Sequence, residues 1–274
     1  MSHKPLGIYI NKSTSRSGQS MANMHSHKSH EIYFLLAGQR RYFVGHSVYE
    51  LVPGNLVFIP GDMLHRTTVS GRKGYERYVV NFSEKHLQRF IDLIGRSNFD
   101  RLLHSGCVEL PADISRRVRQ DLIQLEQGLK NRTAYTSAVA IHLLEDILLC
   151  ALQHGNPAAP CTGETADNIQ RVARYISENY AEPLTLQSAA QMANMEKTYF
   201  SKRFKLLTGF GFHEYLTQTR LLAAAQLLDE TNLSMVTISE RCGFSGSNYF
   251  GDSFRRWMGI SPSQYRKSKK KTAN

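Results

Sequence analysis

Hydrophobic residues recur at helical spacing near the C-terminal end of the chain, in two stretches that match each other. In each stretch two phenylalanines stand four residues apart, which places both on one face of a helix. The matched positions, 50 residues apart, are Phe200 and Phe250, Phe204 and Phe254, and Gly209 and Gly259. A short helix with an apolar face precedes each pair, so the pattern predicts two helix-turn-helix motifs, at about 186–207 and 235–258.

The turns and the outward faces of both motifs are polar. Asn194 tolerates the left-handed backbone of a tight turn, Gly243 makes the second turn, and Ser245 is expected to cap the helix that follows. The faces opposite the phenylalanines carry Thr198, Ser201, Lys202 and Lys205 in the first motif, and Ser247, Asn248, Gly251, Asp252 and Arg255 in the second. Because the major groove of duplex DNA returns to one face every ~34 Å, a duplicated helix of this kind predicts DNA binding.

The N-terminal half has a different pattern, in which short runs of β-branched and aromatic residues alternate with turns. Turn residues such as Pro53-Gly54-Asn55 separate these runs. The predicted strands are 32–36, 41–44, 48–51, 56–59 and 75–82. Many short strands at this spacing predict a sandwich or a barrel.

Helical periodicity follows the strands, near 84–94, 113–130 and 134–153. The last of these helices has an apolar stripe, which is expected to pack on the barrel or to pair with another subunit. A run rich in proline, glycine and alanine then predicts a linker. The expected fold is therefore α+β and multidomain, with a strand-rich domain at 1–153, a linker at 154–164 and an all-helical domain at 165–274.

The helical domain resembles a known family. Residues from about 168 to 267 resemble the DNA-binding region of the AraC/XylS family of bacterial transcription regulators. The stretches that carry the resemblance are Gly243-Phe244-Ser245, Asn248-Tyr249-Phe250, Phe254, Gly259-Ile260-Ser261-Pro262 and Tyr265-Arg266. A single helix-turn-helix match is a weak signal, but two in tandem, joined by a helix that begins at Arg220, are a strong one.

The resemblance implies that the second helix of each motif enters the major groove. Thr198, Ser201 and Lys202, and in the second motif Ser247, Asn248, Gly251 and Asp252, would then face the bases. Lys202, Arg203, Lys205 and Arg255 would supply phosphate or base contacts.

The chain departs from the family pattern at three positions of these helices. Glu196 stands where a capping serine is usual, and Gly251 lies in mid-helix, where glycine costs ~1 kcal/mol relative to alanine. Asp252 stands where a hydrogen-bond donor is common; it repels phosphate but can accept a hydrogen bond from cytosine N4. The second motif is therefore expected to read few bases and to position the protein.

A second group of polar residues, His25, His27, Glu31 and His65, lies among the predicted strands. With the nearby glycines and prolines it resembles the two motifs of the cupin β-barrel, a fold whose metal-binding members use these positions as ligands. The second motif is degraded, because Asp62 replaces a usual glycine and Val69 stands where the motif ends in asparagine. A ligand set of imidazoles and one carboxylate suits Mn, Fe, Ni or Zn.

The resemblance leaves the role of these residues open. In the cupin-like sensor domains of AraC-type regulators, the same framework commonly lines a pocket for a small molecule, often a sugar, without needing a metal. A metal-assisted pocket and a structural polar cluster are the other two interpretations. Tyr33 shares a strand face with Glu31 and is expected to line the pocket, whereas His30 points the other way.

Composition narrows the class of protein. A formal net charge of +11 and a pI near 9.6 favour an anionic partner. The four cysteines are scattered without a CxxC pair, which argues against a zinc finger and a disulfide scaffold. The N-terminus lacks the apolar core of a signal peptide, and no stretch is expected to span a membrane. A cytoplasmic protein is the simplest expectation.

Together with the two family resemblances, these patterns predict a one-component transcription regulator that is not an enzyme and requires no cofactor. The expected partners are promoter or operator DNA, a small-molecule effector such as a sugar, a second copy of the chain and, for an activator, RNA polymerase. The alternative is a cupin metalloenzyme fused to a DNA-binding module, with a divalent transition metal on His25, His27, Glu31 and His65. An architectural DNA-binding protein, the third class, would need no pocket domain.

Overall fold

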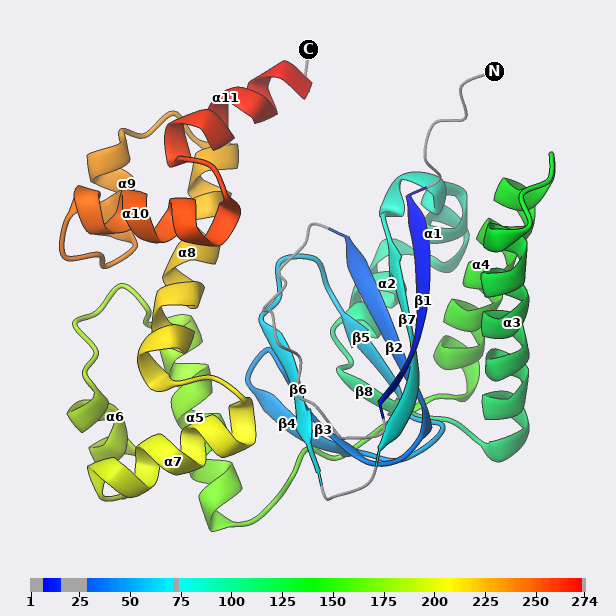
Figure 1. The fold of residues 1–274 in the computed structure, drawn as a ribbon, viewed down its shortest axis with the longest axis horizontal. Helices are drawn as coiled ribbons and strands as arrows, with labels where there is room; N and C mark the ends of the chain where they lie inside the picture. The colour runs from blue at the N-terminus through cyan, green and yellow to red at the C-terminus, as the bar shows by residue number, and fades with distance from the viewer. Residues whose placement is uncertain (1–6, 16–28, 71–73, 273–274) are drawn as a thin grey trace. The chain divides into compact units, whose positions relative to one another are not determined.

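The computed structural model describes residues 7–15, 29–70 and 74–272 (Figure 1). It divides into two compact units, Met1–Thr162 and Gly163–Asn274. The first unit is rich in strands and the second is all-helical, as the hydrophobic patterns predict.

The strands of the first unit pair in antiparallel fashion. They are β1 (Ile8–Ser15), β2 (His30–Ala37), β3 (Arg40–Val44), β4 (Ser47–Leu51), β5 (Leu56–Ile59), β6 (His65–Val69), β7 (Tyr75–Phe82), β8 (Cys107–Glu109) and β9 (Asn156–Pro157). Within the described residues they form a six-stranded sheet, ordered β1-β7-β2-β5-β8-β9, and a three-stranded sheet, ordered β4-β3-β6. The described ladders therefore build two sheets and do not close into one barrel.

Alternating side chains on the large sheet face two different cores. Tyr33 and Leu35 of β2 pack with Tyr42 and Val44 of β3 in the layer between the two sheets. Ile32 and Phe34, one residue away in each case, pack with the helices on the other face. This follows from the period of two in a strand, and it gives the unit three layers.

Helices cover the outer face of the large sheet (Figure 1). They are the 3₁₀ turn Glu84–His86, α1 (Gln88–Ile94), α2 (Arg96–Leu103), α3 (Ala112–Lys130) and α4 (Thr136–His154). The single helix predicted at 84–94 is divided, and Gly95, at φ 86°, separates α1 from an unpredicted α2. Strands β1, β6 and β8 were also missed, because β1 and β6 are rich in polar residues and β8 is only three residues long.

The predicted linker is held in part by the first unit. Within 154–164, β9 pairs with β8, and the amide of Ala158 donates to the carbonyl of Cys107 at 2.9 Å. The amide of Cys161 donates to the carbonyl of Val48 at 2.7 Å. The segment from Asn156 to Cys161 therefore differs from a free linker, since its backbone adds to the sheets.

Helix α4 corrects the expectation that no stretch could span a membrane. By length and composition alone, Thr136–His154 is apolar enough to cross one. In this structure, however, Leu144, Ile147 and Leu148 are fully buried in the core beneath the large sheet. The stripe that suggested packing or pairing is the inner face of a core helix.

The second unit contains α5 (Glu164–Glu178), α6 (Leu186–Met192), α7 (Lys197–Thr208), α8 (Phe212–Glu230), α9 (Met235–Arg241), α10 (Ser247–Met258) and α11 (Pro262–Thr272). Helix α8 belongs to two cores. Its first turns pack Phe212 and Tyr215 against Phe204 of α7. Its later turns bring Leu221 and Leu228 into the core formed with α9 and α10. One helix thus joins the two helix-turn-helix motifs.

Candidate DNA-binding and effector sites

The first motif consists of α6, a turn and α7. Asn194 takes the left-handed conformation in the turn, at φ 54°, as its residue type suggested. The carboxylate of Glu196 accepts hydrogen bonds from the amides of Thr198 and Tyr199, at 2.8 and 2.9 Å. These backbone donors lower the pKa of Glu196. The glutamate therefore caps α7 in place of the usual serine.

The second motif consists of α9, a turn and α10. Ser245 does not cap α10: the helix begins at Ser247, its N-cap is Gly246, and it has no side-chain cap. The expected inward face is present, with Phe250 and Phe254 buried and their rings 5.7 Å apart. Both motifs end on a left-handed glycine, Gly209 at φ 81° and Gly259 at φ 76°. The duplication seen in the sequence is therefore also a duplication of backbone conformation.

The residues expected to contact DNA lie on the outward faces of α7 and α10. Seven of them are exposed and three are half-buried. The exposed ones are Thr198, Lys202, Lys205, Ser247, Asn248, Asp252 and Arg255, and the half-buried ones are Ser201, Arg203 and Gly251. A β-carbon added at Gly251 would meet no other atom within 4 Å. Nothing within the described chain requires glycine there, and the outer face of α10 is open to a partner.

A polar cluster lies between the two sheets of the first unit. The Tyr42 hydroxyl donates to Glu31 Oε1 at 3.3 Å, and the Asn81 amide donates to Glu31 Oε2 at 3.1 Å. His65 Nε2 lies 4.0 Å from Glu31 Oε1, and the other nitrogen of His65 lies 2.8 Å from the carbonyl of Met63. Tyr33 packs edge-on against Tyr42, with ring centroids 4.9 Å apart. The structure thus brings Glu31 and Tyr33 of β2 together with His65 of β6, which is distant from them in sequence.

Residues that the sequence did not single out complete this cluster. Arg40 is 1% exposed, donates to the Thr67 hydroxyl at 3.0 Å and stacks 4.2 Å over the Tyr75 ring. Burial, and then the nearby Glu31, raise the pKa of Tyr42 well above its usual value. Alternation along the predicted strand 41–44 could have placed Tyr42 on the inner face. Arg40 lay outside that strand, so it gave no such signal.

Three more histidines were considered for this site in the sequence. His25 and His27 lie outside the described residues. His30 does point away from the cluster: its ring accepts from the amide of Gly61 at 3.0 Å and lies 3.1 Å from Glu84. In the described part of the chain, no group of three or more His, Cys, Asp or Glu is placed to hold a metal ion. Both Glu31 oxygens accept hydrogen bonds, from Tyr42 and Asn81, so the described residues of this site form a hydrogen-bonded cluster.

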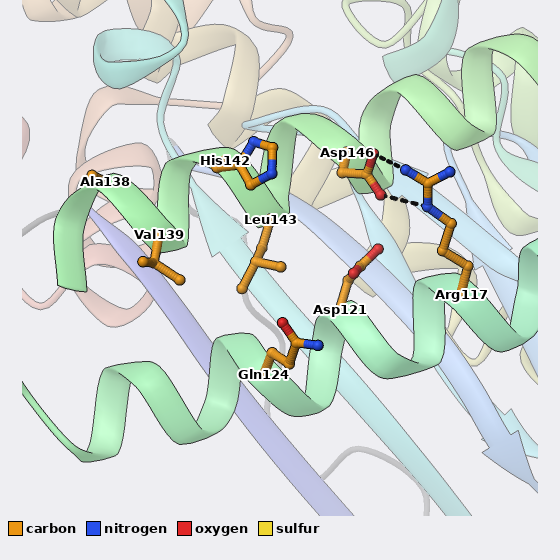
Figure 2. A pocket seen from close by; sticks show the side chains of 8 residues that line it. All are labelled: Arg117, Asp121, Gln124, Ala138, Val139, His142, Leu143 and Asp146. Atoms are coloured by element: carbon orange, nitrogen blue, oxygen red, sulfur yellow. Dashed lines mark hydrogen bonds and ion pairs between the residues drawn. The ribbon is translucent and has the colours of Figure 1, made fainter. Parts of the chain in front are cut away.

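Apart from the polar cluster, the first unit has a hollow of about 540 Å³ between α3 and α4 (Figure 2). Figure 2 shows Asp121 pointing from α3 toward Asp146 on α4. Asp146 is paired with Arg117, whose Nε lies 2.9 Å from one carboxylate oxygen. Burial, and then the neighbouring Asp146, raise the pKa of Asp121 to about 7. The apolar part of the lining includes Val139, which is 45% exposed.

Comparison with known proteins assigns both units. Residues 13–144 match an AraC-like ligand-binding domain, and residues 189–268 match a helix-turn-helix domain. The chain belongs to the AraC/XylS family. The matched ranges contain the polar cluster between the sheets and both duplicated helices, so the candidate DNA-binding faces and the polar cluster lie in the two matched domains.

Individual relatives differ in how much of the chain they share. Over 94 residues the chain is 36% identical to the uncharacterized HTH-type transcriptional regulator YpdC of Escherichia coli (strain K12), and the match spans only 33% of that relative's length. The Msm operon regulatory protein of Streptococcus mutans is 24% identical over 86% of this chain and 83% of its own. The HTH-type transcriptional activator RhaR of Mannheimia succiniciproducens is 23% identical over 89% and 86%.

Proposed function

We propose that this protein is a transcription regulator that binds duplex DNA through α7 and α10 and responds to a small molecule. The observation that carries the proposal is the pair of equivalent helices, each with a buried phenylalanine face and an open polar face. The net charge of +11 favours an anionic partner. In this proposal residues 165–274 bind DNA, residues 1–153 bind the effector, and the protein works in the cytoplasm.

The DNA-binding part is tested by selection from a randomised duplex library with the full chain. We expect one or more enriched sequence tracts, and an affinity that falls steeply as salt is raised. Recovery of no enriched sequence, with equal affinity for every duplex, would instead support an architectural DNA-binding protein.

The proposed effector site is the polar cluster around Glu31, Tyr33 and His65. Hydroxyl, amide, imidazole and carboxylate groups within an aromatic layer suit a small hydroxylated molecule such as a sugar. The effector regulates only if it binds the two functional states of the protein with different affinity. RNA polymerase is a further partner if the protein is an activator.

The effector proposal is tested by screening sugars and related metabolites for a change in DNA affinity. Tyr42→Phe removes the hydroxyl that reaches Glu31 and keeps the ring, and it should weaken binding of a hit roughly tenfold. Tyr78→Phe is the matched control, because its hydroxyl bonds Glu126 at 2.8 Å on the helix-covered face of the sheet. Equal losses in both variants would argue against a site between the sheets.

The competing function is a metalloenzyme. It still needs a test because two of its predicted ligands, His25 and His27, lie outside the described residues. Protein purified without chelator would then hold close to one equivalent of transition metal, and His27→Ala would lose it. Turnover of a substrate without DNA would favour the enzyme, whereas DNA affinity that responds to a ligand favours the regulator.

We also propose that two copies of the chain pair across the α3–α4 hollow. The exposed apolar side chains Val139 and Leu149 lie on α4, beside the polar lining residues. Val139→Asp should lower the dimer fraction in sedimentation. The control is Val52→Asp, which should leave the dimer fraction unchanged, because Val52 directly follows β4 and is similarly exposed. An unchanged dimer fraction in Val139→Asp would exclude this face.

A further inference from the structure

The loop between α5 and α6 contacts the helix that joins the two motifs. Arg220 lies near the middle of α8 and is half-buried. Its Nε donates to the carbonyl of Tyr180 at 2.7 Å, and its Nη2 donates to the carbonyl of Glu182 at 2.8 Å. One guanidinium group therefore binds two carbonyls of the loop, two residues apart, through the fork geometry that only arginine provides.

The opposite side of the same loop contacts the second motif. Gly243, in the turn between α9 and α10, has a φ of +73°. A β-carbon added there would lie 2.5 Å from the carbonyl oxygen of Ala181 and 2.8 Å from its carbonyl carbon and Cα. The obstacle is backbone, which cannot move aside as a flexible side chain can. The second motif therefore packs directly on the Ala181 peptide.

The loop itself is anchored in the first half of the unit. The Tyr175 hydroxyl of α5 donates to the Glu182 carboxylate at 2.8 Å, and the Glu182 amide donates to the carbonyl of Asn179 at 3.1 Å. The loop leads directly into α6, which Thr185 caps through a reciprocal bond with Ser188. A shift of this loop would consequently carry the first motif with it.

We infer that Arg220, the 180–182 loop and Gly243 form a brace that fixes α7 and α10 relative to each other. A single helix such as α8 can bend along its length, and the brace adds a second connection between the motifs. The spacing of the two DNA segments that one protomer reads would then be set by these residues, which do not need to touch DNA. The inference rests on the proposed DNA-binding function.

Gly243→Ala tests the brace, and Gly259→Ala is its matched control. Both glycines lie in the second motif with nearly equal φ values, +73° and +76°, but a β-carbon at Gly259 would meet no other atom within 4 Å. The backbone penalty of alanine is thus shared, and only Gly243→Ala presses on Ala181. Arg220→Met removes the two hydrogen bonds that hold the loop from the α8 side. Arg220→Lys keeps a donor there and should restore part of the brace.

The first measurement is the distance between α7 and α10 in the full chain. Pulsed electron paramagnetic resonance measures this distance between spin labels on Leu206→Cys and Arg256→Cys, both at exposed positions. Cys161 is replaced by serine, because it is the one free cysteine that is not buried. We expect a shifted or broadened distance distribution in Gly243→Ala and Arg220→Met, and the unaltered distribution in Gly259→Ala. Folded variants that all keep the unaltered distribution would overturn the inference.

The second measurement is DNA selection from a randomised library with the same variants. The unaltered chain should select two tracts at one fixed separation. The brace variants should accept separations that differ by a base pair or more, and bind the original site about tenfold more weakly, comparable to a mismatched base pair. If the unaltered chain selects no sequence, the DNA-binding proposal fails, and the distance measurement still decides the brace. If Gly243→Ala does not fold, the two Arg220 variants decide it.

Discussion

The two helix-turn-helix motifs share one backbone plan and differ in the chemistry of their outer faces. Residue 202 of α7 is lysine, and the equivalent position of α10, 50 residues later, is Asp252. Ser201 corresponds to Gly251, whereas Lys205 and Arg255 keep a positive charge. Helix α7 has a carboxylate cap and α10 has none. Duplication has thus preserved what packs, and the faces open to a partner have diverged, so the two helices are expected to do unequal work on DNA.

The largest expected effects come from the shared core. Phe204→Ala and Phe254→Ala should each destabilise the second unit by roughly 3–5 kcal/mol, because both rings are fully buried. Phe204 should cost more, since its neighbours Phe200, Phe212 and Tyr215 are all buried, whereas Phe254 also contacts the half-buried Trp257. Urea unfolding of both variants gives the two free energies. A loss below 1 kcal/mol at either site would contradict the expectation that this ring is a central part of its core.

Lys202→Ala tests whether the first motif reads bases. Removal of the Lys202 side chain should weaken binding to the selected site by about 1–3 kcal/mol if its ammonium group reaches a base edge. Titrations on selected and random duplexes separate this role from a phosphate contact. An equal and small loss on both kinds of DNA would contradict base reading by Lys202.

Asp252→Asn tests the opposite charge at the equivalent position. Removing one negative charge from a face that approaches phosphate should raise affinity for random DNA roughly threefold at low salt. If the carboxylate accepts from a cytosine, the same variant should lose discrimination at one base pair of the selected site. Unchanged affinity and unchanged sequence preference would place Asp252 away from the DNA.

Gly251→Ala should have the smallest effect on folding and should be favourable. Alanine at this open mid-helix position should stabilise the second unit by about 0.5–1 kcal/mol. Thermal unfolding measures the gain, and DNA titration then asks whether the added methyl group obstructs the partner. A stabilised variant with weaker DNA binding would mean that the glycine permits close approach of DNA at α10.

The sequence predicted most of the packing and less of the chemistry between the sheets. Runs of apolar residues located strands β2, β3, β4, β5 and β7, and helical periodicity located both helix-turn-helix motifs. These elements were found because each has a strongly apolar face. Strand β1 has the polar sequence of an edge, and α2 is set apart from α1 only by the conformation of Gly95. Local patterns do not report either feature.

The polar cluster shows where sequence reasoning ends. Glu31 and His65 were identified through a family resemblance, and Tyr33 through alternation. The contacts of Glu31 with Tyr42 and Asn81 depend on how β2, β3 and β7 are arranged around the layer between the sheets. Such contacts join residues up to 50 positions apart. They arise from tertiary pairing, which no single stretch of sequence encodes.

The alternation along β2 constrains how this protein can evolve. Neighbouring residues of 31–35 serve two different cores, so deleting or inserting one residue would exchange the polar cluster with the helix-packing side chains. Substitution at every second position changes one core and leaves the other intact. New ligand preferences in this lineage are therefore expected to arise through point changes at alternate positions of β2, with its length and register kept.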